Sequence, residues 1–321
     1  MHHKIFSEFK CAEGFVEAGF AMNFLGVLIR DGLEQGSSQA KEKRFVTTQF
    51  PSFDEEYFEW IDLLEAVTLA RGRFSMIELG AGWGRWLVNA VAALRQYNRD
   101  LPYELIGVEP EPTHFQYMKM HFMDNGIDPS RHQLIQAAVT DKGREVWFYV
   151  GRPDQWYGQK IAPGPDFVPE SFRQWIRKIC RPQWILKVGR LFMKVGRRFM
   201  GRFVNEGKIR NEQVKKVKAV NLSELLGTLD RVDFIDLDVQ GAELIVLQPA
   251  AEQLDRKVKR VHIGTHSTEI EAGLRRLFSD LGWKNLHDYP LGSENVTPWG
   301  TIKFQDGVQS WINSKLVGTS Q

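Results

Sequence analysis

The sequence predicts an α/β protein with a Rossmann-like, doubly wound and mostly parallel sheet. Short apolar runs typical of buried strands alternate with segments of helical periodicity along most of the chain. One of these runs, at 74–79, enters a glycine-rich turn that opens a helix, and an acidic residue, Glu109, ends the next run. Alternation of this kind is typical of a sheet with helices on both faces.

The individual elements follow from the same patterns. Strands are expected at 74–79, 104–108, 133–139, 145–150, 232–239 and 259–265, with the last strands within 299–312. Helices are expected at 53–71, 84–96, 113–125, 221–229, 242–254 and 269–281. Ligands of such sheets bind beyond the carboxyl ends of the strands, so we look for chemistry at those ends.

Length and composition are those of an ordinary globular protein. The chain has 321 residues, of which 43% are hydrophobic and 26% charged. We expect an N-terminal helical extension at 1–50, an α/β domain in two parts at 51–170 and 219–321, and a basic helical insert at 171–218 between them.

Cysteine usage indicates the compartment. Cys11 and Cys180 are the two cysteines, which excludes a disulfide framework and a four-cysteine zinc site. A reducing, cytoplasmic setting fits best. The apolar stretch 14–29 is interrupted by Glu17 and is shorter than the roughly 20 residues of a membrane span, so we interpret it as packed helices.

The insert at 171–218 concentrates positive charge. It holds fifteen Lys/Arg and two acidic residues, a net charge of +13, whereas the whole chain carries +2. Tryptophan and aliphatic residues interleave with the basic ones. Four interpretations stay open: a helix packed on the domain, a lid over a phosphate-bearing or lipid-linked acceptor, peripheral contact with an anionic membrane, and, as the weakest, nucleic-acid binding.

The glycine turn points to a nucleoside cofactor. Gly80, Gly82 and Gly84 follow the strand 74–79 in a G-x-G-x-G pattern that differs from the dinucleotide spacing G-x-G-x-x-G. Glycines allow a tight bend and a close approach to a ligand, here with Ala81 between them. Glu78 before the turn would repel a pyrophosphate and suits the cationic amino group of S-adenosyl-L-methionine (SAM).

The next strand ends supply the rest of the expected cofactor site. Glu109 is placed to accept the two ribose hydroxyls of the cofactor. Ala137 and Ala138 fall near the expected adenine edge, where small residues leave room for a flat ring. NAD needs a similar carboxylate and remains the competing ligand.

The sequence resembles the FkbM-type family of SAM-dependent O-methyltransferases from about residue 53 to 283. The resemblance rests on the glycine motif at 78–84, the Val-Glu-Pro at 108–110, residues 136–139 with Asp141 and Gly143, and the block 232–243. Asp236 and Gln240 depart from the Lys and Glu that are usual in the family. The resemblance implies a class I methyltransferase fold and methyl transfer from SAM, usually to a hydroxyl of a sugar or secondary metabolite.

Two strand ends are candidates for the chemistry. Asp238 ends the strand 232–239 and His266 follows the strand 259–265, so both side chains are expected at the same rim. We predict that His266 removes the acceptor proton and that Asp238 orients it. The alternative is that both cap strand ends without a catalytic role.

A divalent metal is a second route to the same chemistry. The candidate ligands are Asp236, Asp238, His262 and His266. Glu243 is interpreted as a charge at a helix N-terminus. The loop 154–159 offers Trp156, Tyr157 and Gln159 to a sugar-like acceptor, with surface packing as the alternative.

Two other functions remain open at this point. A nicotinamide-dependent oxidoreductase would use the same strand–turn–helix, although Glu78 and the glycine spacing argue against it. A non-catalytic protein that binds nucleic acid or membranes through its basic insert would keep the fold without turnover.

Overall fold

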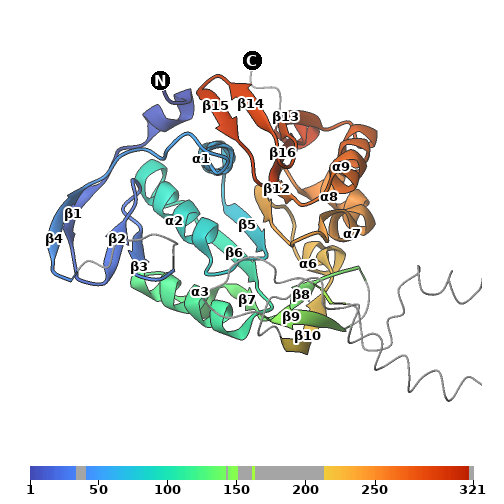
Figure 1. Cartoon of the computed structure of the whole chain (residues 1–321), viewed down its shortest axis with the longest axis horizontal. Helices are drawn as coiled ribbons and strands as arrows, with labels where there is room; N and C mark the ends of the chain where they lie inside the picture. The colour runs from blue at the N-terminus through green and yellow to red at the C-terminus, as the bar shows by residue number, and fades with distance from the viewer. Residues whose placement is uncertain (34–40, 142–143, 151–160, 163–212, 318–321) are drawn as a thin grey trace, which may run out of the picture.

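The computed structural model describes residues 1–33, 41–141, 144–150, 161–162 and 213–317. A seven-stranded sheet runs through the middle of the molecule (Figure 1). Its strands lie in the order β13 (Lys284–Tyr289), β16 (Gly307–Ile312), β12 (Arg260–Thr265), β11 (Phe234–Leu237), β5 (Phe74–Leu79), β6 (Tyr103–Val108) and β7 (Gln133–Ile135). All neighbours are parallel except the two pairs made by β16. The predicted mostly parallel sheet is confirmed.

The order of the strands fixes where a ligand binds. The chain runs outward from β5 to β6 and β7, and then resumes at β11 on the other side of β5. The order in which strands are added to the sheet therefore reverses between β5 and β11. In open α/β sheets the ligand crevice lies beyond the carboxyl ends of the strands at such a switch point.

Helices cover both faces of this sheet. One face carries α1 (Tyr57–Leu69), α2 (Arg85–Tyr97) and α3 (Pro112–Asp124), and the other carries α6 (Leu222–Gly227), α7 (Glu243–Leu247), α8 (Ala251–Lys257) and α9 (Thr268–Asp280). Side chains alternate along β5, so Met76 packs with the first group and Ile77 with the second. Both side chains are fully buried, which stabilises the fold by about 1.5–3 kcal/mol each.

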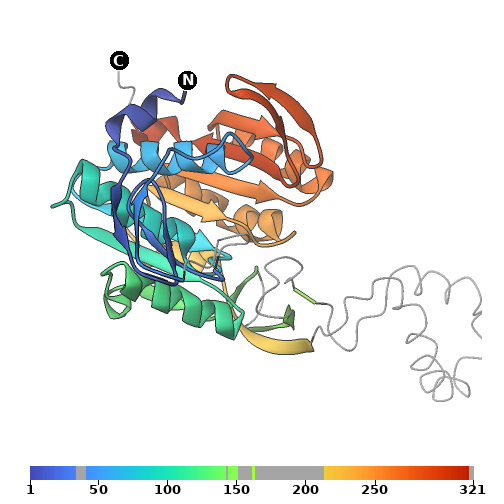
Figure 2. The ribbon, with the colours of Figure 1, turned by 60° about the vertical axis from the view of Figure 1, so that its left-hand side comes forward.

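The N-terminal segment 1–50 is not the predicted helical extension. Its described residues, 1–33 and 41–50, form one 3-10 helix, η1 (Lys4–Glu8), and four strands: β1 (Glu13–Val16), β2 (Phe20–Met22), β3 (Leu28–Arg30) and β4 (Arg44–Thr47). β1 pairs with β4 and β2 with β3, both antiparallel. The prediction is wrong because Gly19 and Gly26 adopt positive φ and divide the apolar stretch into short strands, which pack beside α2 and α3 (Figure 2).

A second, smaller sheet flanks the carboxyl end of the central one. The predicted strand 133–139 is divided between β7 and β8 (Ala138–Val139), and β8 joins β10 (Gln213–Val220) and β9 (Glu145–Val150) in the order β8-β10-β9. The last residues of the predicted helical insert, 213–218, are therefore strand, because they pair along β9. The rest of the insert that precedes residue 213, and the loop with Trp156, Tyr157 and Gln159, lie outside the described residues.

The remaining elements are short. They are η2 (Pro129–Arg131), η3 (Gln248–Ala250), the hairpin of β14 (Glu294–Thr297) and β15 (Gly300–Lys303), and α10 (Ser314–Val317). Of the helices in the described ranges, none has the length and apolarity that a membrane span requires.

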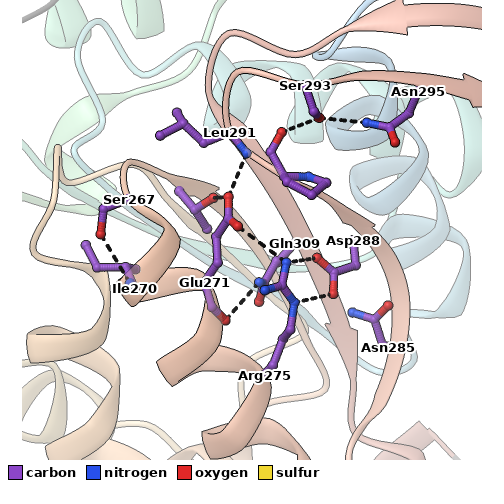
Figure 3. A network of polar contacts seen from close by, with 12 residues as sticks. Ser267, Ile270, Glu271, Arg275, Asn285, Asp288, Leu291, Ser293, Asn295 and Gln309 are labelled. Carbon is purple, nitrogen blue, oxygen red and sulfur yellow. Dashed lines mark hydrogen bonds and ion pairs between the residues drawn. The ribbon is translucent and has the colours of Figure 1, made fainter.

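A polar network joins α9 to the far edge of the sheet (Figure 3). The buried Glu271 accepts hydrogen bonds from the Leu291 backbone N–H at 2.7 Å and from the Thr265 hydroxyl at 3.2 Å. Arg275, one turn further along α9, makes two 2.7 Å bonds to Asp288 on β13 and contacts Glu271 at 3.4 Å. The network thereby fixes the loop that leads into the β14–β15 hairpin.

Candidate active site

The glycine turn after β5 is clamped between two neighbouring strand ends. The backbone N–H groups of Gly80 and Ala81 both donate to the Val108 carbonyl at 3.0 Å, and the Asp238 N–H donates to the Leu79 carbonyl at 3.0 Å. Gly80 has a φ of +81°, and a Cβ on it would lie 1.8 Å from the Asp238 carbonyl oxygen. Glycine is therefore required here by both conformation and space.

A cavity of about 500 Å³ opens beyond this turn, at the switch point between β5 and β11. Six of the eight predicted cofactor residues line it: Glu78, Gly80, Ala81, Gly82, Glu109 and Ala138. The other two lie outside the lining. Gly84 is the N-cap residue of α2 and packs against Met118, and Ala137 is buried in the core.

Glu109 is the best-positioned of the predicted cofactor residues. It is 5% exposed, and its two carboxylate oxygens accept hydrogen bonds from the backbone N–H groups of Gly82 at 2.8 Å and Glu111 at 2.7 Å. Burial raises the pKa of Glu109 to about 8, although these donors act in the opposite direction. The two bonds fix the carboxyl group in the cavity wall and leave further lone pairs for a diol.

Glu78 has a different position from the one expected. Its carboxylate accepts hydrogen bonds from the Trp86 N–H at 3.4 Å and the Leu87 N–H at 3.1 Å, in the first turn of α2. Burial, together with the nearby charge of Asp236, raises its pKa. Glu78 thus caps the first turn of α2, and its acidic side chain forms part of the cavity lining.

The predicted catalytic pair is brought together. His266 Nε2 lies 3.4 Å from an Asp238 carboxylate oxygen, and Asp238 lines the cavity while His266 lies behind it. His266 Nδ1 is 2.7 Å from the carboxylate of Glu243, the first residue of α7. Glu243 is completely buried, so the interpretation as a plain helix-end charge missed its contact with the histidine.

Gln240 links the two members of this pair. Its side-chain nitrogen lies 2.9 Å from Asp238 and 2.8 Å from His266 Nε2, and its backbone has a φ of +51°. Burial alone would lower the pKa of His266, but the hydrogen bond to Glu243 and the charge of Asp238 raise it to about 9. The imidazole is therefore held between acids and is mostly protonated at neutral pH.

The predicted metal candidates separate into two groups. Asp238 and His266 lie with Glu243, whereas Asp236 and His262 lie with Glu59 of α1. Glu59 was not found from the sequence. The available signal was the three-residue spacing of Glu59, Asp62 and Glu65, which places three acids near one face of a helix whose other residues are mostly apolar.

The chain matches a known family over most of the cavity-forming region. Residues 79–282, more than half of the chain, match the model described as the methyltransferase FkbM domain. The chain belongs to the FkbM methyltransferase family. The fold and the glycine turn therefore belong to a SAM-dependent methyltransferase, and the nicotinamide oxidoreductase and non-catalytic alternatives are wrong.

The name of one sequence relative agrees with this assignment. A protein of Jannaschia sp. (strain CCS1) named "Putative methyltransferase" is 25% identical over 300 residues, which cover 90% of this chain and 91% of that protein. Among solved structures, precorrin 8w decarboxylase from Methanobacterium thermoautotrophicum has a TM-score of 0.37 at 10% identity, covering 79% of this chain and 89% of its own. Precorrin-6Y C5,15-methyltransferase from Geobacter metallireducens GS-15 has a TM-score of 0.34 at 11% identity, covering 78% and 86%.

The cavity residues are compatible with SAM. Gly80 and Gly82 add no side chain to the lining, and Glu109 presents a carboxyl group fixed by two backbone N–H groups, as a ribose diol would require. The small Ala138 leaves room beside them for the adenine. The acidic Glu78 in the same lining suits the positive charge of the methionine part.

Proposed function

We propose that this methyltransferase methylates a hydroxyl oxygen of a sugar, glycan or other natural product. When bound, SAM supplies an electrophilic methyl group on a positively charged sulfur. Asp238, Gln240 and Asp306 line the side of the cavity near His266, and each offers oxygen acceptors to hydroxyl groups. A polyhydroxylated acceptor is the class of molecule that matches such a wall.

The observation that carries this proposal is the chain Glu243–His266–Asp238 at the cavity wall. Asp238 meets the acceptor hydroxyl, His266 lies 3.4 Å behind it, and Glu243 orients the imidazole from a buried position. The proton that a hydroxyl loses on methylation passes to the Asp238–His266 pair. A histidine held by a carboxylate is a common proton acceptor in such reactions.

The predicted roles of the loop and the insert remain part of the proposal. Trp156, Tyr157 and Gln159 are expected to contact the acceptor, and the basic insert at 171–218 is expected to bind a phosphate-bearing or lipid-linked acceptor or an anionic membrane surface. A cytoplasmic location is consistent with the sparse cysteines.

The test is transfer of a labelled methyl group from SAM to a panel of sugars, glycans and hydroxylated natural products. We expect an O-methyl product, with kcat about 10²- to 10⁴-fold lower in Asp238→Asn and His266→Gln and SAM affinity retained. Glu252→Gln serves as the control, since both Glu252 and its partner Arg256 are exposed. Labelling of a nitrogen, a carbon or RNA instead would refute the hydroxyl assignment.

A further inference from the structure

A second group of ionisable side chains lies deeper in the cavity, under α1. Asp236 of β11 pairs in register with Glu78 of β5 on one side and with His262 of β12 on the other. Residues paired in this way project from the same face of the sheet. α1 covers that face and adds Glu59. One ligand atom each of Glu59, Asp236 and His262 lies within 4.8 Å of the others, and all three residues line the cavity.

His262 is held as a metal-binding histidine is held. Its Nδ1 lies 2.8 Å from a carboxylate oxygen of Asp62. Asp62 is fully buried, and it also accepts hydrogen bonds from the guanidinium of Arg260 at 2.6 Å and from the Ser310 hydroxyl. Asp62 can only accept from the ring, so in the neutral imidazole Nδ1 carries the proton and Nε2 has the lone pair. Among the described residues, Nε2 has no hydrogen-bond partner, although the side chain is only 3% exposed. A carboxylate behind the distal ring nitrogen is the usual support of a histidine ligand.

We propose that Glu59, Asp236 and His262 bind a divalent transition-metal ion in the inner part of the cavity. Two carboxylates and one imidazole form a mixed oxygen–nitrogen set that suits Mn²⁺, Fe²⁺, Co²⁺ or Zn²⁺. The ligand atoms of Glu59 and Asp236 lie within 4.8 Å of each other in the cavity lining, so two acids face the same point. A divalent cation at that point would balance both carboxylates. Three protein ligands also leave coordination positions open toward the cavity.

The other acidic group is less suited to a metal. Both ring nitrogens of His266 already have partners, Glu243 on one side and Gln240 with Asp238 on the other. An ammonium group is the competing occupant of the inner site. An ammonium group is bound by oxygen acceptors alone. It would not need an imidazole that is fixed by the buried Asp62–Arg260 pair.

The role of this ion rests on the proposed function. A divalent ion that binds an acceptor oxygen lowers the pKa of its hydroxyl group, which makes the oxygen a better nucleophile for the methyl group. Metal binding itself does not depend on the identity of the acceptor, so the two proposals can fail separately.

The experiment is a titration of chelator-treated protein with Mn²⁺, followed by the loss of the free-ion EPR signal, with Co²⁺ absorption as a second probe. We expect one bound ion per chain, and affinity at least about tenfold lower in Glu59→Gln and in His262→Gln. Pulsed EPR of the bound Mn²⁺ should show coupling to an imidazole nitrogen that His262→Gln removes. Glu59 is partly exposed, so Glu59→Gln tests the site without a change in the buried histidine.

Glu243→Gln is the matched control for the outer group, and it should keep the metal affinity of the wild type. SAM titration of each variant by calorimetry accompanies the metal titration. Absence of Mn²⁺ and Co²⁺ binding would overturn the proposal, as would loss of binding in Glu243→Gln with retention in Glu59→Gln. Loss of SAM affinity in Glu59→Gln without any metal binding would assign the inner group to the amino group of SAM instead.

Discussion

At the scale of single residues, the decisive feature is an imidazole with an acid on each side. Glu243 is fully buried and holds His266 Nδ1 at 2.7 Å, whereas Asp238 is half-exposed and faces the cavity. The buried acid sets the orientation and the protonation of the ring, and in the proposed mechanism the exposed acid connects the ring to the acceptor. A residue of each kind is needed because a proton acceptor must be both positioned and reachable.

The raised pKa of His266 predicts a rate that increases with pH. The pKa is about 9, so the neutral form that accepts a proton grows about tenfold per pH unit below that value. We expect kcat/KM to rise from pH 7 and to level off above pH 9. Glu243→Gln removes the main group that raises the pKa, so its profile should level off at lower pH with a smaller maximum. A rate that falls between pH 7 and 9 would mean that His266 acts in its protonated form.

At the scale of elements, the glycine turn depends on contact between β5 and β11. Gly80→Ala places a methyl group on a backbone carbonyl at a positive φ, so we expect a loss of about 2–6 kcal/mol in unfolding free energy. Gly282→Ala is the matched control, since its φ is +70° with nothing within 4 Å of an added Cβ. That control should cost only about 1–2 kcal/mol. Urea denaturation measures both, and equal losses would contradict the steric argument.

The attachment of α9 to the sheet edge depends on Glu271. Glu271→Gln weakens the charge-assisted contact with Arg275, and Glu271→Ala also leaves the partly buried Leu291 N–H and the buried Thr265 hydroxyl without this acceptor. We expect about 1–3 kcal/mol of destabilisation for the alanine variant and less for glutamine. Exposed Glu252→Ala on α8 should stay within about 0.5 kcal/mol of the wild type. If Glu271→Ala is as mild as Glu252→Ala, water has replaced the lost carboxylate.

At the scale of the whole molecule, the sequence predicts the parts that repeat a local pattern. The strands β5, β6, β11 and β12 are apolar runs with clear ends, and residues at those ends, such as Glu109 and Asp238, were found because strand ends meet at one edge. The N-terminal strands were missed because each has only three or four residues, too few to show a period. Glu59 and Glu243 were missed because their function depends on partners 177 and 23 positions away, at Asp236 and His266.

Binding of the cofactor should stabilise the whole α/β domain, because the cavity is built from β5, β6, β11 and the loops that follow them. SAM at about 100 times its dissociation constant adds roughly 2.7 kcal/mol to the folded state, which corresponds to a Tm increase of about 4–8 °C. NADH should leave Tm unchanged, since the acidic Glu78 and Glu109 line the cavity at the glycine turn and Arg85, which also lines it, is paired with Glu56. Glu109→Ala should remove the SAM shift while Glu252→Ala keeps it. A shift with NADH that equals the shift with SAM would show that the cavity does not distinguish a sulfonium from a pyrophosphate, and the charge argument for Glu78 would fail with it.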